Sequence, residues 1–313
     1  MIAFGHHDAE LAEGATSDTL LLRPPRDVVV VEVGPRDGLQ NETSSIPTWV
    51  KIAFVDALTD AGLPIIEVTS FVNPKAVPQL ADAGEVMTGI RRANGTRYSV
   101  LVPNERGFER ALEARSDAIA LFTSATEAFA QANVGTSIDG TFERFEPVAV
   151  KAKHRGLWVR GYVSVAFGCP YSGTVDTRAV VRVAERLLQL GCDEVCLADT
   201  IGTATPESVI DTMRAAQASI PLQRLALHFH DTSGTALANV ERALDLGVRI
   251  FDSAAGGLGG CPFAPGAPGN LATEQLVRHM NALGVRTGVE LEAVAAALKL
   301  VRPYIPRLGR LTA

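Results

Sequence analysis

Cysteine is scarce in this chain, with only Cys169, Cys192, Cys196 and Cys261 among 313 residues. Such sparse usage excludes a small disulfide-held secreted domain and favours a reducing compartment, so we expect a cytoplasmic protein. Cys192 and Cys196 are spaced C-x3-C, but no second pair is present to complete a zinc site. We expect these two to be buried apolar residues, because free cysteine is often buried.

Long apolar runs and basic runs are also missing. No segment is apolar enough to cross a bilayer, and the first residues fit neither a secretory signal nor an Arg-rich transit peptide. The net charge of −6, without a basic cluster, argues against nucleic acid or an anionic membrane as a partner. We expect residues 1–26 to be a polar N-terminal extension, a candidate for disorder, and residues 27–313 to form one catalytic domain.

The chain does have a steady alternation of short β-branched runs with helix-like stretches. The predicted strands are residues 27–33, 64–70, 97–102, 117–123, 157–167, 193–199, 224–230 and 248–254. Several helix-like stretches end at a glycine, as at Gly62, Gly191 and Gly247.

Eight strand–helix units predict an α/β protein with a closed (β/α)8 TIM barrel. An open doubly wound sheet is the alternative, but it would need a Gly-rich phosphate turn where the chain reads GPRDGLQNE. "TPESVIDTM" predicts a helix with Thr205 as N-cap and Pro206 as its first residue. Residues 291–305 predict an extra C-terminal helix beyond the eighth unit.

Polar side chains gather where the predicted strands end, which is where barrels of this kind place their chemistry. Arg36 and Asp37 follow the first strand, Glu67 lies among apolar residues in the second, and Asp199 and Thr200 end the sixth. An acid inside a barrel strand is costly unless it is paired or bound. Structural alternatives are a surface ion pair for the first two, a salt bridge for Glu67, and a turn or cap for the last two.

The seventh strand, LALHFHD, carries the sharpest signal. His228 and His230 are two residues apart, so a strand points both to one face, and such a pair at a strand end favours metal ligands. Asp231 either orients a histidine or caps the next helix. Asn270 is an additional oxygen donor or else a loop residue. Imidazole, carboxylate and amide donors without thiolates suit Mg²⁺ or Mn²⁺.

After the eighth strand comes GGLGGCPFAPGAPGN, residues 256–270, which holds six Gly, three Pro and Cys261. Taken alone it is typical of a surface linker. The alternative is a mobile loop that carries Cys261 to a reaction centre.

Together these residues resemble the 3-hydroxy-3-methylglutaryl-CoA lyase family. The resemblance runs from residue 27 to about 285 and rests on GPRDGLQNE, GLPIIEVTSFVNPKAVPQ, RGYVSVAFGCPY, ADTIGTATP, LHFHDTSGTALAN and GLGGCPFAPGAPGNLATE, in that order. Gly256 and Pro268 depart from the family, which commonly has Ala and Ser there. The stretch after residue 285 matches poorly.

The resemblance implies a role for each candidate residue. A divalent metal, Mg²⁺ or Mn²⁺, would be bound by Asp37, His228, His230 and Asn270. Arg36 would stabilise the enolate oxygen, Glu67 would hold the substrate end and its proton network, and Cys261 would act as acid or base on a mobile loop. Gln40, Tyr162 and Thr200 would form substrate walls. Asp37 and His228 both stay open as the general base.

The implied function is metal-dependent retro-Claisen cleavage of (S)-3-hydroxy-3-methylglutaryl-CoA to acetyl-CoA and acetoacetate, a step of leucine degradation. The alternatives are a lyase for another 3-hydroxyacyl-CoA such as citramalyl-CoA, a condensing relative, and a non-catalytic barrel that binds a CoA ester. The expected partners are therefore a small acyl-CoA and, by resemblance, other copies of the chain in a homo-oligomer.

Overall fold

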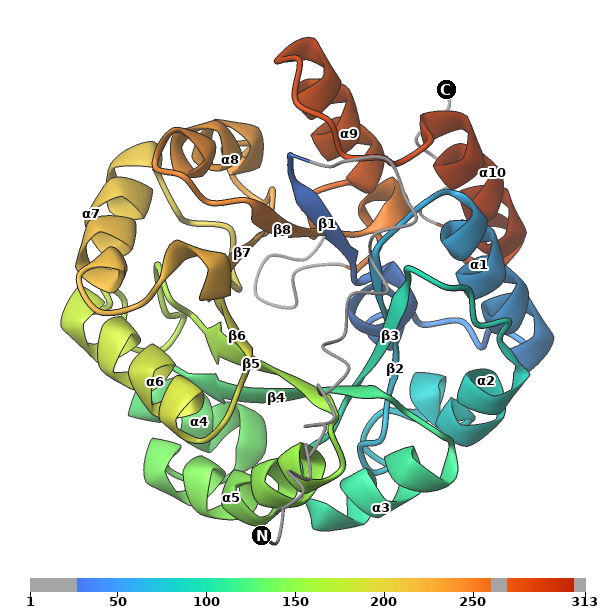
Figure 1. The fold of residues 1–313 in the computed structure, drawn as a ribbon, viewed down its shortest axis with the longest axis horizontal. Coiled ribbons are helices and arrows are strands. Elements are labelled where there is room, and N and C mark those ends of the chain that lie inside the picture. The colour runs from blue at the N-terminus through green and yellow to red at the C-terminus, as the bar shows by residue number, and fades with distance from the viewer. Residues whose placement is uncertain (1–26, 260–268, 307–313) are drawn as a thin grey trace, which may run out of the picture.

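The computed structural model describes residues 27–259 and 269–306. Its eight parallel strands follow one another in chain order and close into a barrel, with β1 paired to β8 and helices in a ring outside (Figure 1). The strands are β1 Val29–Glu32, β2 Ile65–Ser70, β3 Arg97–Leu101, β4 Ala118–Ser124, β5 Trp158–Ser164, β6 Glu194–Asp199, β7 Leu225–Phe229 and β8 Ile250–Ser253. The predicted TIM barrel is confirmed, and closure excludes the open sheet.

Ten α-helices lie in the described residues. They are α1 Thr48–Asp60, α2 Ala83–Gly89, α3 Glu105–Glu113, α4 Glu127–Val134, α5 Ile138–His154, α6 Thr177–Gln189, α7 Pro206–Gln217, α8 Ala236–Asp245, α9 Thr273–Ala282 and α10 Leu291–Val301. Shorter turns are the π-helix η2 Gly34–Gly38 and the 3-10 helices η3 Pro78–Leu80, η4 Leu222–Arg224, η5 Ala255–Gly257 and η6 Arg302–Tyr304. In this part of the chain no helix has the length and apolar character needed to cross a membrane.

Local sequence signals explain where several helices begin and end. Gly62, Gly191 and Gly247 all have positive φ, which lets the chain turn out of the helix before each. At α7 the hydroxyl of Thr205 accepts from Ser208 N, and Ser208 Oγ accepts from Thr205 N, which completes a capping box with Pro206 at the first position.

Two features of the fold differ from expectation. The strand predicted over 157–167 ends at Ser164, because Val165 takes a left-handed conformation with φ of 52°. After β4 the chain forms two helices, α4 and α5, where one was expected. The predicted extension over residues 1–26 lies outside the described residues.

The extra C-terminal helix is present as α10, which packs against α1 and lies between α1 and α9 in the helix ring (Figure 1). Its start is joined to the end of α1, where Glu290 N donates to Ala61 O at 2.9 Å. Val294, Ala297 and Val301 form its buried face. The helix thus completes the outer layer beside the junction of β1 and β8.

Candidate active site

The barrel opens at the C-terminal ends of its strands into a cavity of about 610 Å³. Its lining brings together seven of the residues singled out from the sequence: Arg36, Asp37, Gln40, Tyr162, Thr200, His228 and His230. An eighth, Asn270, contacts Asp37. Phe122, Phe129 and Leu101 supply part of its apolar wall. The cavity therefore combines an apolar lining with convergent polar groups, as ligand sites do.

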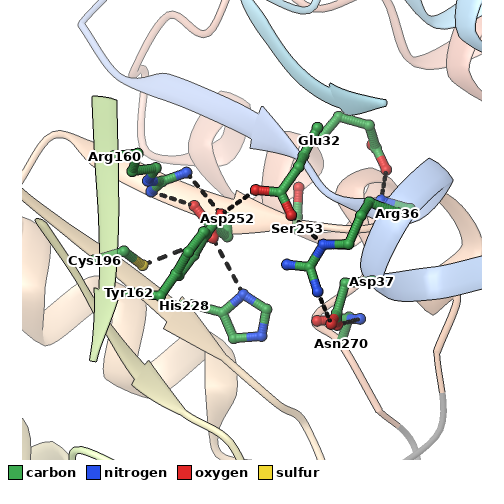
Figure 2. Close-up of polar contacts among 12 residues, drawn as sticks. Glu32, Arg36, Asp37, Arg160, Tyr162, Cys196, His228, Asp252, Ser253 and Asn270 are labelled. Atoms are coloured by element: carbon green, nitrogen blue, oxygen red, sulfur yellow. Dashed lines mark hydrogen bonds and ion pairs between the residues drawn. The ribbon is translucent and has the colours of Figure 1, made fainter. Parts of the chain in front are cut away.

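Three of the proposed metal ligands meet in space. Asp37, His228 and His230 each offer one ligand atom, and these atoms lie within 4.8 Å of one another. The fourth, Asn270, pairs with His230 in an isolated β-bridge and donates from Nδ2 to Asp37 Oδ2 at 2.8 Å. Figure 2 shows Asn270 beside Asp37.

Two buried atoms of this group have no hydrogen-bond partner within the described chain: Asn270 Oδ1 and His230 Nδ1. A buried polar atom without a partner is costly, and amide oxygen and imidazole nitrogen are both atoms that a cation can bind. The donor set is oxygen and imidazole nitrogen, which fits a divalent ion such as Mg²⁺ or Mn²⁺. These residues therefore fit the metal that the sequence analysis implied.

The charges of the ligands also suit a cation. Burial lowers the pKa of His230 to about 4, with the neighbouring His228 acting in the same direction, so His230 is neutral near pH 7. Burial alone would raise the pKa of Asp37, but Arg36 and the two histidines hold it at about 2. Near neutral pH the site therefore offers an anionic carboxylate and a neutral imidazole.

Arg36 is presented by η2, immediately before Asp37. Its Nε donates to Glu67 Oε1 and its Nη1 donates to Asp37 Oδ1 at 2.7 Å. Burial would lower the pKa of Arg36, but Glu67 and Asp37 raise it above its ordinary value. The guanidinium is thus a permanent cation at the cavity wall, and Glu67 is both salt-bridged, as its structural alternative required, and part of the site.

A chain of polar contacts continues from Glu67 across the barrel interior. Tyr162 Oη donates to Glu67 Oε2 at 3.0 Å and accepts from Arg160 Nη1 at 3.2 Å. Arg160 Nη2 donates to Asp252 Oδ1 at 2.7 Å, and Asp252 Oδ2 lies 3.2 Å from His228 Nδ1 (Figure 2). The chain thus connects Arg36 to a proposed metal ligand on the other side.

Arg160 and Asp252 were not predicted as site residues from the sequence. Both are almost fully buried, with 1% and 2% of their surface exposed. A signal was available, because each is a charged residue inside an otherwise apolar strand, as Glu67 is. Burial would raise the pKa of Asp252, but Arg160 and His228 hold it below its ordinary value.

Other polar candidates at the strand ends have structural roles. Asp199 accepts from Thr203 N and Ala204 N, both at 3.0 Å, so it shapes the turn after β6. Burial raises its pKa to about 6, against those two hydrogen bonds. Thr200 accepts from Val165 N at 2.8 Å while lining the cavity.

Asp231 and Gln40 are also placed by their contacts. Asp231 Oδ1 accepts from Ala236 N at 3.0 Å, so it caps the start of α8, as one of its two alternatives held. Gln40 Nε2 donates to Asp37 Oδ1 at 3.2 Å from its place in the cavity wall.

Three of the four cysteines lie in the described residues, and all three are buried. Cys192 and Cys196 are fully buried, as expected, and burial raises the pKa of Cys192 to about 12. Cys169 is also buried and contacts Thr126. Cys261 and Pro268 lie outside the described residues.

Gly256, one of the two residues that depart from the family, has a φ of 62°, a left-handed conformation favourable to glycine.

Comparisons with known proteins agree with this geometry. Rat mitochondrial hydroxymethylglutaryl-CoA lyase is 49% identical over 289 residues, which cover 92% of this chain and 88% of that protein. Rat cytoplasmic 3-hydroxy-3-methylglutaryl-CoA lyase is 49% identical over 273 residues, covering 87% and 80%. The crystal structure of the HMG-CoA lyase from Brucella melitensis superposes with a TM-score of 0.87 at 49% identity, covering 89% of this chain and 99% of that chain.

The family resemblance and the assignment to carbon–carbon lyases are thereby confirmed. A family model described as HMGL-like matches residues 27–301, which contain all eight strands and α10. The chain therefore belongs to the HMGL-like family.

Proposed function

We propose that this protein cleaves (S)-3-hydroxy-3-methylglutaryl-CoA to acetyl-CoA and acetoacetate in a divalent-metal-dependent reaction. The observation that carries the proposal is the convergence of Asp37, His228, His230 and Arg36 on one cavity of about 610 Å³. Its support is membership of a family whose relatives, at 49% identity, are named as lyases for this ester.

The metal would be held by Asp37, His228, His230 and Asn270, and we propose Mg²⁺ or Mn²⁺ as the ion. Support comes from the oxygen and imidazole donors and from the two buried atoms that lack a partner in the described chain. When bound, such an ion supplies Lewis-acid polarisation of substrate oxygens.

The residues of the chain would then share the proton and charge transfers. Asp37 or His228 takes the proton of the tertiary hydroxyl. The bond between the carbon that carries this hydroxyl and the methylene beside the thioester then breaks. The hydroxyl-bearing fragment leaves as acetoacetate, and the electron pair of the broken bond stays with the methylene as the acetyl-CoA enolate. Arg36 stabilises the enolate oxygen as a fixed cation. The Cys261 thiol gives its proton to the enolate carbon, a role proposed from the family resemblance alone.

Substrate contacts would come from the same cavity. Tyr162, Thr200 and Gln40 line it, and Glu67 holds Arg36 in place, which supports their proposed roles. A homo-oligomer is proposed from the resemblance. A cytoplasmic location is proposed from the sparse cysteines. One relative at 49% identity is named cytoplasmic, and another of equal identity is named mitochondrial.

The test is product analysis with EDTA-treated full-length protein, Mg²⁺, Mn²⁺ or no metal, and a panel of 3-hydroxyacyl-CoA esters. We expect acetoacetate from (S)-3-hydroxy-3-methylglutaryl-CoA only when metal is restored. His230→Ala should abolish product, whereas His154→Ala, at the exposed end of α5, should not.

Two outcomes would contradict the proposal. Pyruvate formed from citramalyl-CoA, without acetoacetate from the first ester, would assign the protein to the alternative substrate. The absence of product from every ester, in protein that still binds them, would indicate the non-catalytic barrel.

A further inference from the structure

His228 is tied to a carboxylate that neither the sequence motifs nor the comparisons assign. Its Nδ1 lies 3.2 Å from Asp252 Oδ2, and both residues are buried. His228 lies on β7 and Asp252 on the adjacent β8, where the two residues are direct register partners. Their side chains therefore project from neighbouring strands into the same interior (Figure 2).

Asp252 is itself held from a third strand. Arg160, on β5, donates from Nη2 to Asp252 Oδ1 at 2.7 Å, and its side chain is 1% exposed. The thiol of Cys196 on β6 lies 3.7 Å from Oδ2. The carboxylate thus has a charged partner on one oxygen, and the histidine and the thiol on the other.

These contacts determine the role of each imidazole nitrogen. A carboxylate paired with a buried arginine can only accept hydrogen bonds, so His228 Nδ1 must carry the hydrogen. The lone pair of a neutral His228 then lies on Nε2, the atom left for a metal among Asp37, His230 and Asn270. A His228 held in this way has no lone pair left for a further proton, so this arrangement leaves Asp37 as the general base of the proposed reaction.

We propose that Asp252, held in place by Arg160, is a positioning residue that fixes the tautomer and ring orientation of His228, so that Nε2 faces the metal site. The inference rests on the proposed function for the identity of that site. Histidine ligands commonly donate their other ring N–H to a carboxylate in this way, and loss of the carboxylate weakens metal binding.

His230 and Asp231 do not form a pair like that of His228 and Asp252. His230 Nδ1 has no hydrogen-bond partner within the described chain. Asp231, although adjacent to His230, caps α8 through Ala236 N. Asp252 is thus the acid that orients a ligand, and Asp231 offers a matched control for it.

The first experiment measures the dissociation constant for Mn²⁺ by electron paramagnetic resonance in wild type, Asp252→Asn and Asp231→Asn. The amide at position 252 can donate as well as accept, so it no longer selects one tautomer of His228. We expect Asp252→Asn to bind Mn²⁺ roughly 10–100-fold more weakly, and Asp231→Asn, which keeps its capping oxygen, to bind as wild type does. Wild-type affinity in a folded Asp252→Asn protein would overturn the inference.

A second measurement needs no change at position 252, in case that variant does not fold. Nitrogen-15 NMR of the metal-free wild-type protein at about pH 8, where histidine is ordinarily neutral, reports which ring nitrogen is protonated. The His228 signals are identified by their loss in His228→Gln. We expect hydrogen on Nδ1 alone, and hydrogen on Nε2 or a mixture of tautomers would overturn the inference.

The two measurements also separate this inference from the proposed function. A wild-type protein that shows the Nδ1–H tautomer but binds no Mn²⁺ would contradict the proposed metal-dependent function. A wild-type protein that binds Mn²⁺ as tightly as its Asp252→Asn variant would contradict only the positioning role.

Discussion

Arg36 contacts two carboxylates with one guanidinium, Glu67 through Nε and Asp37 through Nη1. Its Nη2 makes no hydrogen bond within the described chain, so donors remain for a developing negative charge at the cavity. Tyr162 supports the same group, with its ring centroid 5.9 Å from Arg36 Cζ. Because the guanidinium is planar and both its Nε and its Nη1 are held by carboxylates, its Nη2 points in a defined direction.

Arg36→Lys should therefore reduce kcat by roughly 10²–10³-fold, the range found when a preorganised charge-stabilising donor is removed. Lysine keeps the positive charge but cannot hold both carboxylates in one fixed geometry. Steady-state kinetics at saturating metal measure the effect, with Arg186→Lys as control, because that arginine pairs with Asp139 on the surface. A kcat equal to that of wild type would contradict the assignment of Arg36 to the enolate.

At this scale the sequence predicts residues better than it predicts their partners. His228 and His230 share a face by strand periodicity alone, and the structure brings them together with Asp37. The pairing of Arg160 with Asp252 depends on the register of β5, β6, β7 and β8 around a closed barrel. No local pattern encodes that relation, so the chain of contacts from Glu67 to His228 emerges only in three dimensions.

At the scale of elements, strand periodicity and glycine-ended helices are local properties, and they locate most of the barrel. The π-helix η2 was not predicted, because five residues containing Pro35 and two glycines have the composition of an ordinary turn. It nevertheless places Arg36 and Asp37 at the cavity. Such a turn depends on the space around it: a Cβ at Gly38 would lie 2.6 Å from Leu258 Cβ.

The helix α10 allows a matched pair of substitutions. Ala297 is fully buried on the face that packs inward, whereas the adjacent Ala296 is exposed. Ala297→Asp places an unpaired charge in the core and should lower the free energy of unfolding by roughly 3–5 kcal/mol. Ala296→Asp should change it by less than about 1 kcal/mol.

Urea unfolding followed by circular dichroism measures both changes. Equal free energies of unfolding for the two variants would mean that the packing of α10 contributes little to the stability of the barrel. A large difference would show that the extra helix is part of the structural unit formed by α1 and the barrel.

For the whole molecule, closure of the barrel brings the end of β1 against the segments that follow β8, and Glu32 lies at that junction. It is fully buried, with Oε1 accepting from Gly34 N and Ala255 N and Oε2 accepting from Thr273 Oγ1. Burial raises the pKa of Glu32 to about 8, against those three hydrogen bonds. One carboxyl group thus joins η2, η5 and α9, and near pH 7 it is protonated.

The pH dependence of stability follows from this shift. The folded protein keeps the Glu32 proton up to about pH 8, whereas the unfolded chain releases it near the ordinary glutamate pKa of 4.5. The free energy of unfolding therefore falls as pH rises through this interval, by about 1.4 kcal/mol per unit. Asp199, whose pKa is about 6, adds to the decline only at lower pH, and His230 opposes it only below about 6.5.

Glu32→Gln should remove this decline, because glutamine resembles the protonated acid. Its oxygen can accept from Gly34 N and Ala255 N while its amide donates to Thr273 Oγ1. Between about pH 6.5 and 8 the folded and unfolded states differ in protonation at Glu32 but not at Asp199 or His230. Urea unfolding of metal-free protein over this range should show a falling curve for wild type and a flatter one for the variant. Glu105→Gln, which removes a surface acid paired with Lys151, should keep the wild-type slope. Parallel curves for wild type and Glu32→Gln would mean that Glu32 is already ionised in the folded barrel. Its three hydrogen bonds would then outweigh its burial.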